Sequence, residues 1–272
     1  MLLGGVGFKL AVVPFHMWTP DVYQGAPAPV TAYIATVSKG AMVALLLRYF
    51  GPISQDSGAT LFWVFAAIAI ASMVAGNLLA LRQDNVKRIL AYSSIANLGY
   101  VLVAFLASGE RAPVAVTFFL FAYFATSLVA FGVVTALSTP EHEAESIDDY
   151  RGLGRTRRWT AAAFTVALLS LAGMPLTMGF IGKFYLVTAG AGAGLWALVT
   201  VLVLTSAVSI YYYTRVIVAM WVGRADEAVD VGAAVDGGSA AVLAALTAFL
   251  IVFGVYPAPL IQLIERAVAT LS

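Results

Sequence analysis

Long apolar runs alternate with short polar connections along the whole chain. Eight runs are long enough to count as membrane segments. They cover approximately residues 1–18, 29–50, 60–81, 88–107, 113–137, 159–188, 195–221 and 239–264. The intervals between them carry the proline, glycine and charged residues that are typical of turns. The pattern predicts an all-α fold: a polytopic transmembrane helix bundle of about eight membrane helices, with 1–272 as one membrane domain.

Two of these runs contain a proline that predicts a broken helix. Pro14 interrupts the first run and Pro175 interrupts the sixth. Proline removes a helix hydrogen bond, and unpaired backbone at membrane depth is tolerated only where protein buries it or where it lines water. The sixth run would also make ~45 Å of straight helix at 1.5 Å per residue, which is too long for an upright span.

Composition supports the membrane interpretation and excludes several kinds of chemistry. The chain is 61% hydrophobic and 11% charged, with a formal net charge of +1, so nothing indicates a nucleic-acid partner. It has no cysteine, which excludes thiolate metal sites and iron–sulfur clusters. Its two histidines, His16 and His142, are too few for a haem pair or a zinc site of their own. No cofactor or metal is therefore expected in this chain.

Lysine and arginine gather on one side of the predicted bundle. The connections after the first, third, fifth and seventh runs carry Arg82, Lys87, Arg88, Arg151, Arg155, Arg157, Arg158 and Arg224, whereas the others carry only Arg111, with Arg48 near a helix end. Positive charge marks the cytoplasmic side, so these odd-numbered connections are expected to be cytoplasmic and both termini to lie on the outer face. The connection 138–158 is interpreted as a solvated loop with a short helix, or alternatively as a docking surface. The glycine-rich loop 222–238 is expected to be a tether.

Three lysines lie inside apolar runs: Lys9, Lys39 and Lys183. A charge inside a membrane segment is costly and is by default a hypothesis about function. Lys39 is about ten residues from each end of its run, too far to snorkel to the interface. No carboxylate at mid-membrane depth is available to pair with it. Lys9 lies near the Pro14 break, where unpaired carbonyls can receive an ammonium group. An unwound segment near Pro175 would draw Lys183 towards the membrane centre, whereas a continuous helix would let it snorkel.

Lysine at such a position suits proton transfer. Burial disfavours the ammonium form, so a buried lysine can release and regain a proton near neutral pH. Hydroxyls and amides could link the lysines into a relay; the candidates are Tyr33, Thr36, Ser38, Ser93, Ser94, Asn97, Tyr100, Tyr123, Thr126 and Ser127. In membrane helices such groups more often hold helices together.

Three passages carry a family resemblance. They are FKLAVVPFHMWTPDVYQGAPAPVTAYIATVSKGA (8–41), GNLLALRQDNVKRILAYSSIANLGY (76–100) and LAGMPLTMGFIGKFYL (171–186). They resemble the antiporter-like membrane subunits of bacterial NADH-quinone oxidoreductase, respiratory complex I, and the wording PDVYQGAPAPV is most similar to the subunit N family.

The resemblance implies a fold of fourteen membrane helices with two inverted repeats, of which this sequence matches the last eight, so that the N-terminal helices are missing. It implies that Lys9, Lys39 and Lys183 form the family's lysine line for proton translocation, driven by quinone reduction in partner subunits. NADH, FMN, iron–sulfur clusters and quinone would then be bound by those partners. The other membrane subunits and the lipid bilayer of the bacterial plasma membrane are the implied surroundings.

Two alternatives stay open at this point. The chain could be a subunit of a multisubunit sodium/proton antiporter, or a structural membrane anchor of a redox complex in which the lysines only pair with partner helices.

Overall fold

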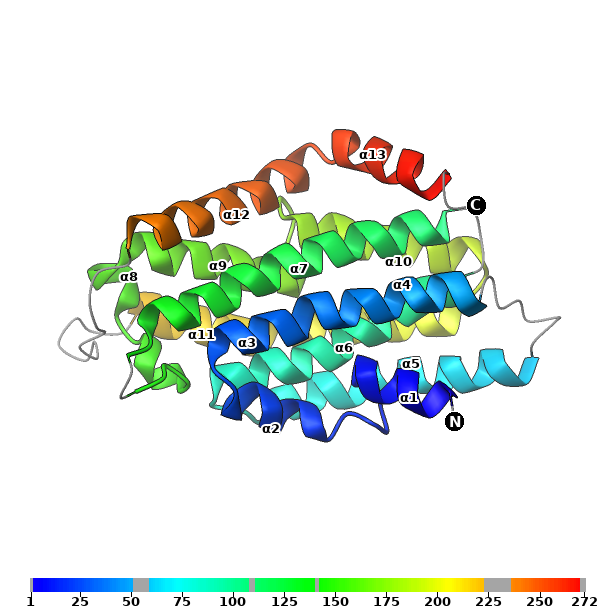
Figure 1. The fold of residues 1–272 in the computed structure, drawn as a ribbon, viewed down its shortest axis with the longest axis horizontal. Helices are drawn as coiled ribbons and strands as arrows, with labels where there is room; N and C mark the ends of the chain where they lie inside the picture. The colour runs from blue at the N-terminus through cyan, green and yellow to red at the C-terminus, as the bar shows by residue number, and fades with distance from the viewer. Residues whose placement is uncertain (1, 51–58, 108–110, 140–141, 223–235, 270–272) are drawn as a thin grey trace.

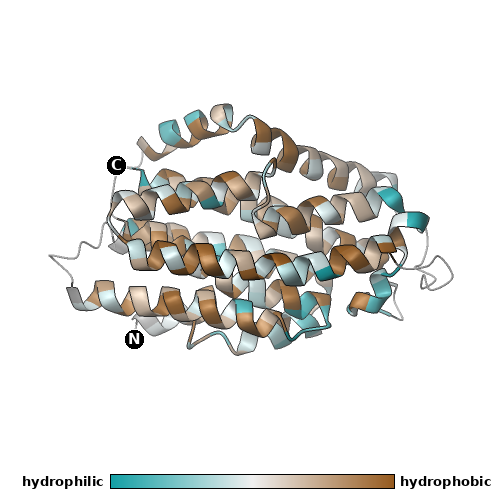
Figure 2. Ribbon diagram, turned by 180° about the vertical axis from the view of Figure 1, so that it is seen from behind, coloured by the Kyte–Doolittle hydropathy of each residue, from teal (hydrophilic) through white to brown (hydrophobic). Residues whose placement is uncertain are grey.

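The computed structural model describes residues 2–50, 59–107, 111–139, 142–222 and 236–269 as a bundle of elongated helices with their axes roughly aligned (Figure 1). In this part of the chain the backbone is helical without β-strands; one isolated bridge joins Asn85 and Ser146. Hydrophobic residues dominate the length of the helices, and hydrophilic residues gather towards their ends (Figure 2). This distribution is what a bilayer-spanning bundle requires, because the lipid core cannot solvate polar groups.

The helices follow in chain order as α1 (Leu2–Leu10), α2 (Trp18–Gly25), α3 (Ala28–Tyr33), the π-helical segment η1 (Ile34–Ser38), α4 (Lys39–Phe50), α5 (Ala59–Ala80), α6 (Val86–Leu106), α7 (Ala112–Leu137), the short 3₁₀ helix η2 (Ile147–Tyr150), α8 (Leu153–Thr156), α9 (Arg158–Ala172), α10 (Met178–Gly192), α11 (Trp196–Val222), α12 (Gly237–Val255) and α13 (Ala258–Ala269).

Six helical stretches are long and apolar enough to cross a membrane: Ala28–Arg48, Thr60–Ala80, Val86–Leu106, Ala112–Leu137, Trp196–Val222 and Gly237–Val255. They coincide with six of the eight predicted runs. The remaining two runs are the ones predicted to be broken. The expected all-α membrane bundle is therefore confirmed.

Both predicted breaks are present. In the first run α1 ends at Leu10 and the helix resumes at Trp18, so that Pro14 lies in the interruption. In the sixth run α9 ends at Ala172 and α10 begins at Met178, on either side of Pro175. Each interruption contains a non-glycine residue with positive φ, Ala11 in the first and Leu176 in the second, which a regular helix cannot accommodate.

Two predicted boundaries were wrong. The first run was expected to end at residue 18, followed by a connection, but residues 18–25 form α2. Pro20 lies in the first turn of α2, where its missing N–H does not cost a helix hydrogen bond. The last run was expected to be continuous over 239–264, but it breaks after Val255, at Pro257, and continues as α13.

α6 is the central helix of the bundle (Figure 1). All its residues except Arg88 and Tyr92 are buried. A helix that is buried around its whole circumference must be enclosed by other helices on all sides. α2, α5, α7, α10 and α11 pack around it, and it therefore carries polar residues into the middle of the protein.

The connection 138–158 is only partly solvated. Asp148 and Arg151 are exposed, but Tyr150 and Leu153 are buried against the bundle. The two short helices η2 and α8 lie here, and the Ser146 side chain caps η2. The predicted connection at 51–58 and most of the predicted tether, 223–235, lie outside the described residues.

Candidate functional site

Lys39 lies in the middle of its membrane helix and is 1% exposed. It is the first residue of α4, directly after the π-helical segment. Its Nζ donates to Ser94 Oγ on α6 at 2.5 Å and lies over the ring of Tyr23 from α2, 5.5 Å from the ring centroid. The prediction that Lys39 turns towards the interior of the bundle agrees with this position.

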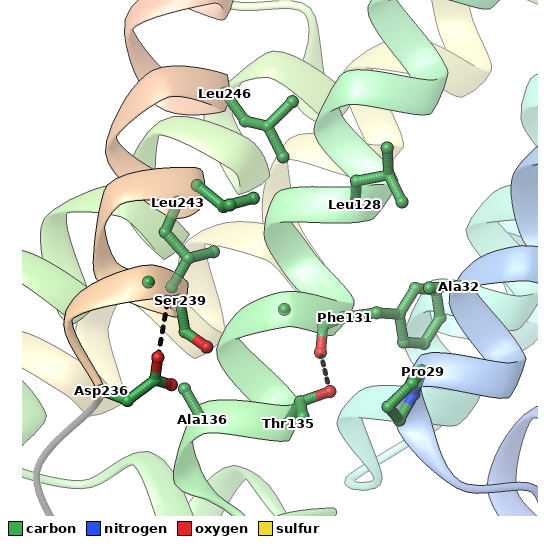
Figure 3. A pocket seen from close by; sticks show the side chains of 13 residues that line it. Pro29, Ala32, Leu128, Phe131, Thr135, Ala136, Asp236, Ser239, Leu243 and Leu246 are labelled. Atoms are coloured by element: carbon green, nitrogen blue, oxygen red, sulfur yellow. Dashed lines mark hydrogen bonds between the residues drawn. The ribbon is translucent and has the colours of Figure 1, made fainter.

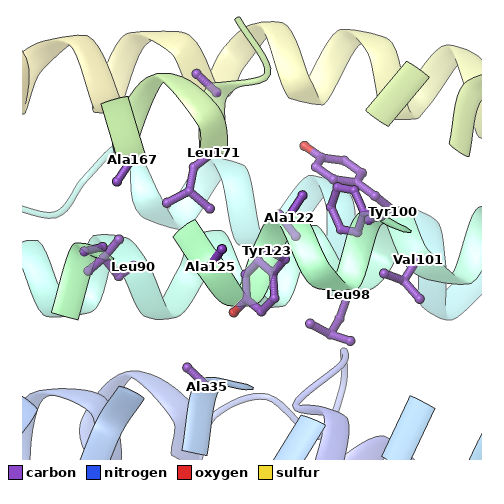
Figure 4. Packing of buried hydrophobic residues seen from close by; sticks show 14 of the residues in the cluster. Ala35, Leu90, Leu98, Tyr100, Val101, Ala122, Tyr123, Ala125, Ala167 and Leu171 are labelled. Atoms are coloured by element: carbon purple, nitrogen blue, oxygen red, sulfur yellow. The ribbon is translucent and has the colours of Figure 1, made fainter. Parts of the chain in front are cut away.

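Ser94 is the point at which these helices meet. Its Oγ accepts from Tyr123 Oη of α7 at 2.6 Å, and Tyr23 Oη lies 3.5 Å away. Figure 4 shows Tyr123 turned towards the helix that carries Ala35, the segment that leads into Lys39. Two predicted linkers, Ser94 and Tyr123, therefore contact the Lys39 cluster, whereas a third, Tyr33, is 60% exposed.

The π-helical segment determines which way the Lys39 side chain points. Within it Thr36 Oγ1 donates back to the Ala32 carbonyl at 2.7 Å. A π turn holds one residue more than an α turn, so the side chains that follow are rotated relative to a regular helix. Such turns occur frequently at functional sites.

Lys183 is buried by the second broken helix. It is 7% exposed, and its Nζ donates to the carbonyls of Leu171 at 2.8 Å and Ala172 at 3.0 Å. These are the last carbonyls of α9, which lack partners within the helix and carry the negative end of its dipole. The third donor reaches Ser206 Oγ on α11 at 2.8 Å. The break near Pro175 thus creates the binding site for the lysine that follows it.

A hollow of about 280 Å³ reaches Lys183 between α9, α10 and α11. Ala172, Gly173 and Ser206 line it together with the lysine. A water molecule takes about 30 Å³ in the liquid, so this space is large enough for several. Most of the other residues that line it, such as Phe180, Leu202 and Ile210, are apolar.

Further polar side chains extend between the two lysines. Ser93 on α6 hydrogen-bonds with Tyr213 of α11 and with Asn97. The neighbouring Tyr212 donates to Asn77 Oδ1 on α5 at 3.0 Å. Asn77 Nδ2 in turn donates to Tyr100 Oη at 3.0 Å, and the ring of Tyr100 lies under Lys183 Nζ, 5.2 Å from the ring centroid.

Sequence reasoning missed several members of this network, namely Tyr23, Asn77, Ser206, Tyr212 and Tyr213. Two signals could have identified some of them. Asn77 is the one amide in an otherwise apolar helix, and three successive tyrosines, 211–213, stand inside the run of α11. The predicted linker Thr126 meets Ser170, which had not been predicted, at 3.0 Å between α7 and α9.

The two buried lysines lack carboxylate partners among the described residues. The ion pairs in this part of the chain involve Lys87, Arg88, His142, Arg151 and Arg215. Lys39 and Lys183 instead contact hydroxyls, carbonyls and tyrosine rings. A lysine without a fixed counter-charge can lose its proton without leaving a buried carboxylate unpaired.

Lys9 does not join these clusters. It lies on an exposed side of α1, and the structure places it away from the hydrogen-bond network of Lys39 and Lys183. Of the three lysines predicted to form one line, the fold brings two into one polar interior.

Lys87, expected in a solvated connection, is completely buried. Its Nζ donates to the carbonyls of Gln24 and Ala26 and to Glu143, each at 2.8 Å. Glu143 also accepts from the backbone N–H of Ala28, the first residue of α3. The pair therefore ties the connection 138–158 to the junction of α2 and α3, which leads to Lys39.

A surface groove lies elsewhere. It has a volume of about 760 Å³ and runs between α3, α7 and α12 (Figure 3). Apolar residues such as Leu128, Phe131 and Leu243 line most of it, and Asp236 caps α12 at one end. It contains neither lysine, so we do not assign it to the site. Among the described residues no cluster of three or more His, Asp or Glu side chains could hold a metal.

Comparison with known proteins places this arrangement in a family. Residues 1–209 match the family described as NADH:quinone oxidoreductase/Mrp antiporter, transmembrane region. The chain belongs to this family. The resemblance that the three sequence passages indicated is confirmed.

Curated relatives name one branch of the family. Proteins named NADH-quinone oxidoreductase subunit N from Nitrosospira multiformis and Ectopseudomonas mendocina are 52% and 49% identical over 98% of this chain. These alignments cover 56% and 55% of the relatives. The chain thus spans about half the length of the curated relatives it matches.

Solved structures agree in fold. A chain in respiratory complex I from Thermus thermophilus with bound aureothin superposes with a TM-score of 0.83 at 36% identity, covering 95% of this chain and 56% of that one. A chain of the Mrp complex from Dietzia sp. gives a TM-score of 0.87 at 22% identity, covering 99% and 58%. The second likeness concerns the fold alone.

Proposed function

We propose that this chain is part of a proton-translocating, antiporter-like membrane subunit of an NADH-quinone oxidoreductase. Electron transfer belongs to partner subunits, which bind NADH, FMN, iron–sulfur clusters and quinone. The observation that carries the proposal is the pair of buried lysines, Lys39 and Lys183, which have no carboxylate partner among the described residues and have buried polar side chains between them.

The geometry supports a protonation cycle at each lysine. Burial disfavours the ammonium form, whereas hydrogen bonds from the ammonium to carbonyls and hydroxyls favour it. Because these effects oppose each other, a modest change in the local field can transfer the proton. At Lys39 the proton would leave along the bond to Ser94, and at Lys183 the neighbouring hollow offers space for water to receive it.

Lys9 belongs to the proposal through the family resemblance. It matches the family's lysine on the first broken helix, and a longer protein would supply the N-terminal helices against which α1 packs. In that assembly the three lysines would form one line. Residues 1–272 are then the C-terminal portion of a proton-translocating membrane domain.

The proposed orientation has the odd-numbered connections in the cytoplasm of a bacterial cell. Arg82, Arg88, Arg151, Arg155 and Arg158 lie in or beside the connections at one end of the bundle (Figure 1). Positive charge favours the cytoplasmic side. The beginning of α1 and the end of α13 lie towards the other end (Figure 1).

The experiment is to replace Lys39 by methionine in the assembled oxidoreductase and to measure NADH-driven acidification in membrane vesicles. We expect proton pumping and coupled quinone reduction to fall at least tenfold, with normal assembly on native gels. Lys39→Arg should restore little, because arginine stays protonated. Normal pumping in either variant would contradict a protonation cycle and favour a structural anchor.

A sodium/proton antiporter subunit is the second candidate, favoured by the family match over residues 1–209, whose description also names the Mrp antiporter. Vesicles in sodium-free buffer distinguish the two. Pumping that persists without sodium supports the oxidoreductase proposal, and an absolute requirement for sodium supports the antiporter.

A further inference from the structure

Lys39 and Lys183 each have a tyrosine ring beneath the ammonium group. Lys39 Nζ lies 5.5 Å from the centroid of the Tyr23 ring, and Lys183 Nζ lies 5.2 Å from that of Tyr100. Both cation–π contacts found among the described residues are made by these two lysines. An aromatic face attracts a cation within about 6 Å of its centroid, most strongly where water is excluded.

The hydroxyl of Tyr100 is not the group that serves Lys183. An ammonium has three N–H donors, and those of Lys183 go to Leu171 O, Ala172 O and Ser206 Oγ. The Tyr100 hydroxyl instead accepts from Asn77 Nδ2 at 3.0 Å. The π face is therefore what this tyrosine offers to the lysine.

Tyr23 is held in an equivalent way. It is completely buried, its hydroxyl faces Ser94 at 3.5 Å, and its ring packs edge-on against Phe131, with the centroids 5.8 Å apart. Fixed on both sides, the ring cannot turn its face away from Lys39. The two rings come from different helices, α2 and α6, yet occupy the same position relative to a buried lysine.

The acceptors around both lysines are neutral. Serine hydroxyls and peptide carbonyls solvate the ammonium but do not balance its charge, and carboxylates are absent from both clusters in the described part of the chain. We propose that the ring faces of Tyr23 and Tyr100 stand in for carboxylate counter-charges and stabilise the protonated form of Lys39 and Lys183. Unlike a carboxylate, a ring does not become an unpaired buried charge when the lysine loses its proton.

The inference rests on the proposed function, because proton pumping is what the experiment measures. Of the two tyrosines, Tyr100 offers the sharper test. Phenylalanine, 4-fluoro-, 3,5-difluoro- and 3,4,5-trifluorophenylalanine are placed at position 100 in the assembled oxidoreductase. Fluorine weakens the negative ring face while almost preserving the ring's volume. The pH profile of NADH-driven proton pumping is then recorded in vesicles for each variant.

Tyr100→Phe is the reference for the series, because it keeps the ring and lacks the hydroxyl that accepts from Asn77, as every fluorinated member does. With increasing fluorination the alkaline limb should move stepwise to lower pH, by about one pH unit at trifluorophenylalanine, because the protonated lysine loses stabilisation. Tyr100→Leu should move the limb at least as far. If the leucine variant does not assemble, the fluorinated series decides alone.

The matched control is the same series at Phe164, a completely buried ring of α9 that packs on Tyr150 and faces no lysine. We expect no trend there. A flat series at position 100 relative to Tyr100→Phe, or an equal trend at position 164, would overturn the inference.

The failure of this inference can be told from the failure of the proposed function. If Lys39→Met abolishes pumping while the fluorinated series is flat, only the role of the rings is wrong. If Lys39→Met pumps normally, the protonation cycle itself is wrong.

Discussion

At the scale of single residues, Gly173 shows how closely the second lysine site is built. Its φ is +82°, in the left-handed region that glycine adopts without strain. A Cβ built on it would lie 2.8 Å from Cδ and 3.3 Å from Nζ of Lys183. The residue that ends α9 therefore also leaves the space that the lysine side chain occupies.

We expect Gly173→Ala to reduce proton pumping severalfold by displacing Lys183 from the carbonyls of α9. Gly194→Ala is the control, because Gly194 also has a positive φ of +74° but no atom within 4 Å of the added Cβ. Both variants carry a left-handed strain of about 1–2 kcal/mol. Pumping and thermal unfolding are measured on both; equal pumping in the two would contradict the steric argument.

Lys87 yields a prediction about stability. Lys87→Met removes the ion pair with Glu143 and leaves the carbonyls of Gln24 and Ala26 without their donor. We expect a loss of about 3 kcal/mol, at the lower end for broken buried pairs because the Glu143 side chain is 28% exposed. The midpoint of thermal unfolding in detergent measures it.

The control for Lys87 is Asp21→Asn, which removes the ion pair of Arg88 with a carboxylate side chain that is 75% exposed. Exposed pairs contribute about 0–1 kcal/mol. A loss as large for Asp21→Asn as for Lys87→Met would show that burial is not what makes the Lys87 pair important.

At the scale of elements, the end of α12 supports the second broken helix. Gly254 packs directly on the interruption between α9 and α10: a Cβ there would lie 2.5 Å from the backbone carbon of Thr177 and 2.6 Å from Leu176 O. Backbone cannot yield as a flexible side chain can. The closeness of α12 thus helps to hold the interruption in the conformation that Lys183 needs.

We predict that Gly254→Ala costs about 1–3 kcal/mol of stability, as overpacking does, and lowers pumping by shifting the interruption. Gly237→Ala, at the start of the same helix, adds its Cβ where no atom lies within 4 Å. It should change neither the thermal unfolding midpoint nor pumping. Unchanged behaviour of Gly254→Ala would mean that α12 has no role in holding the break.

At the scale of the whole molecule, the proposed orientation can be tested by labelling introduced cysteines. The chain contains no cysteine of its own that would react with the label. Asp148 and Arg111 are both exposed; Asp148 lies in η2, shortly before α8, and Arg111 directly precedes α7. The start of α7 and α8 lie at opposite ends of the bundle (Figure 1). We expect a membrane-impermeant maleimide to label Asp148→Cys only from the cytoplasmic side and Arg111→Cys only from the outside. The reverse pattern would refute the orientation derived from the charge distribution.

The sequence by itself determined the membrane bundle, six of its spans, the two proline breaks and the position of Lys39 and Lys183 inside apolar segments. These features depend on local composition: apolar length decides what crosses the bilayer, and proline decides where a helix hydrogen bond is missing. For the same reason the sequence indicated buried lysines but not what surrounds them.

Only the tertiary structure decided the surroundings. Ser94, Tyr23 and Tyr123 meet at Lys39 from α6, α2 and α7, and Tyr212, Asn77 and Tyr100 join α11 and α5 to α6. Such contacts depend on which faces of distant helices meet, and residue spacing along one helix does not contain that information. The burial of Lys87 and the exposure of Lys9 were decided in the same way, by packing between segments far apart in the chain.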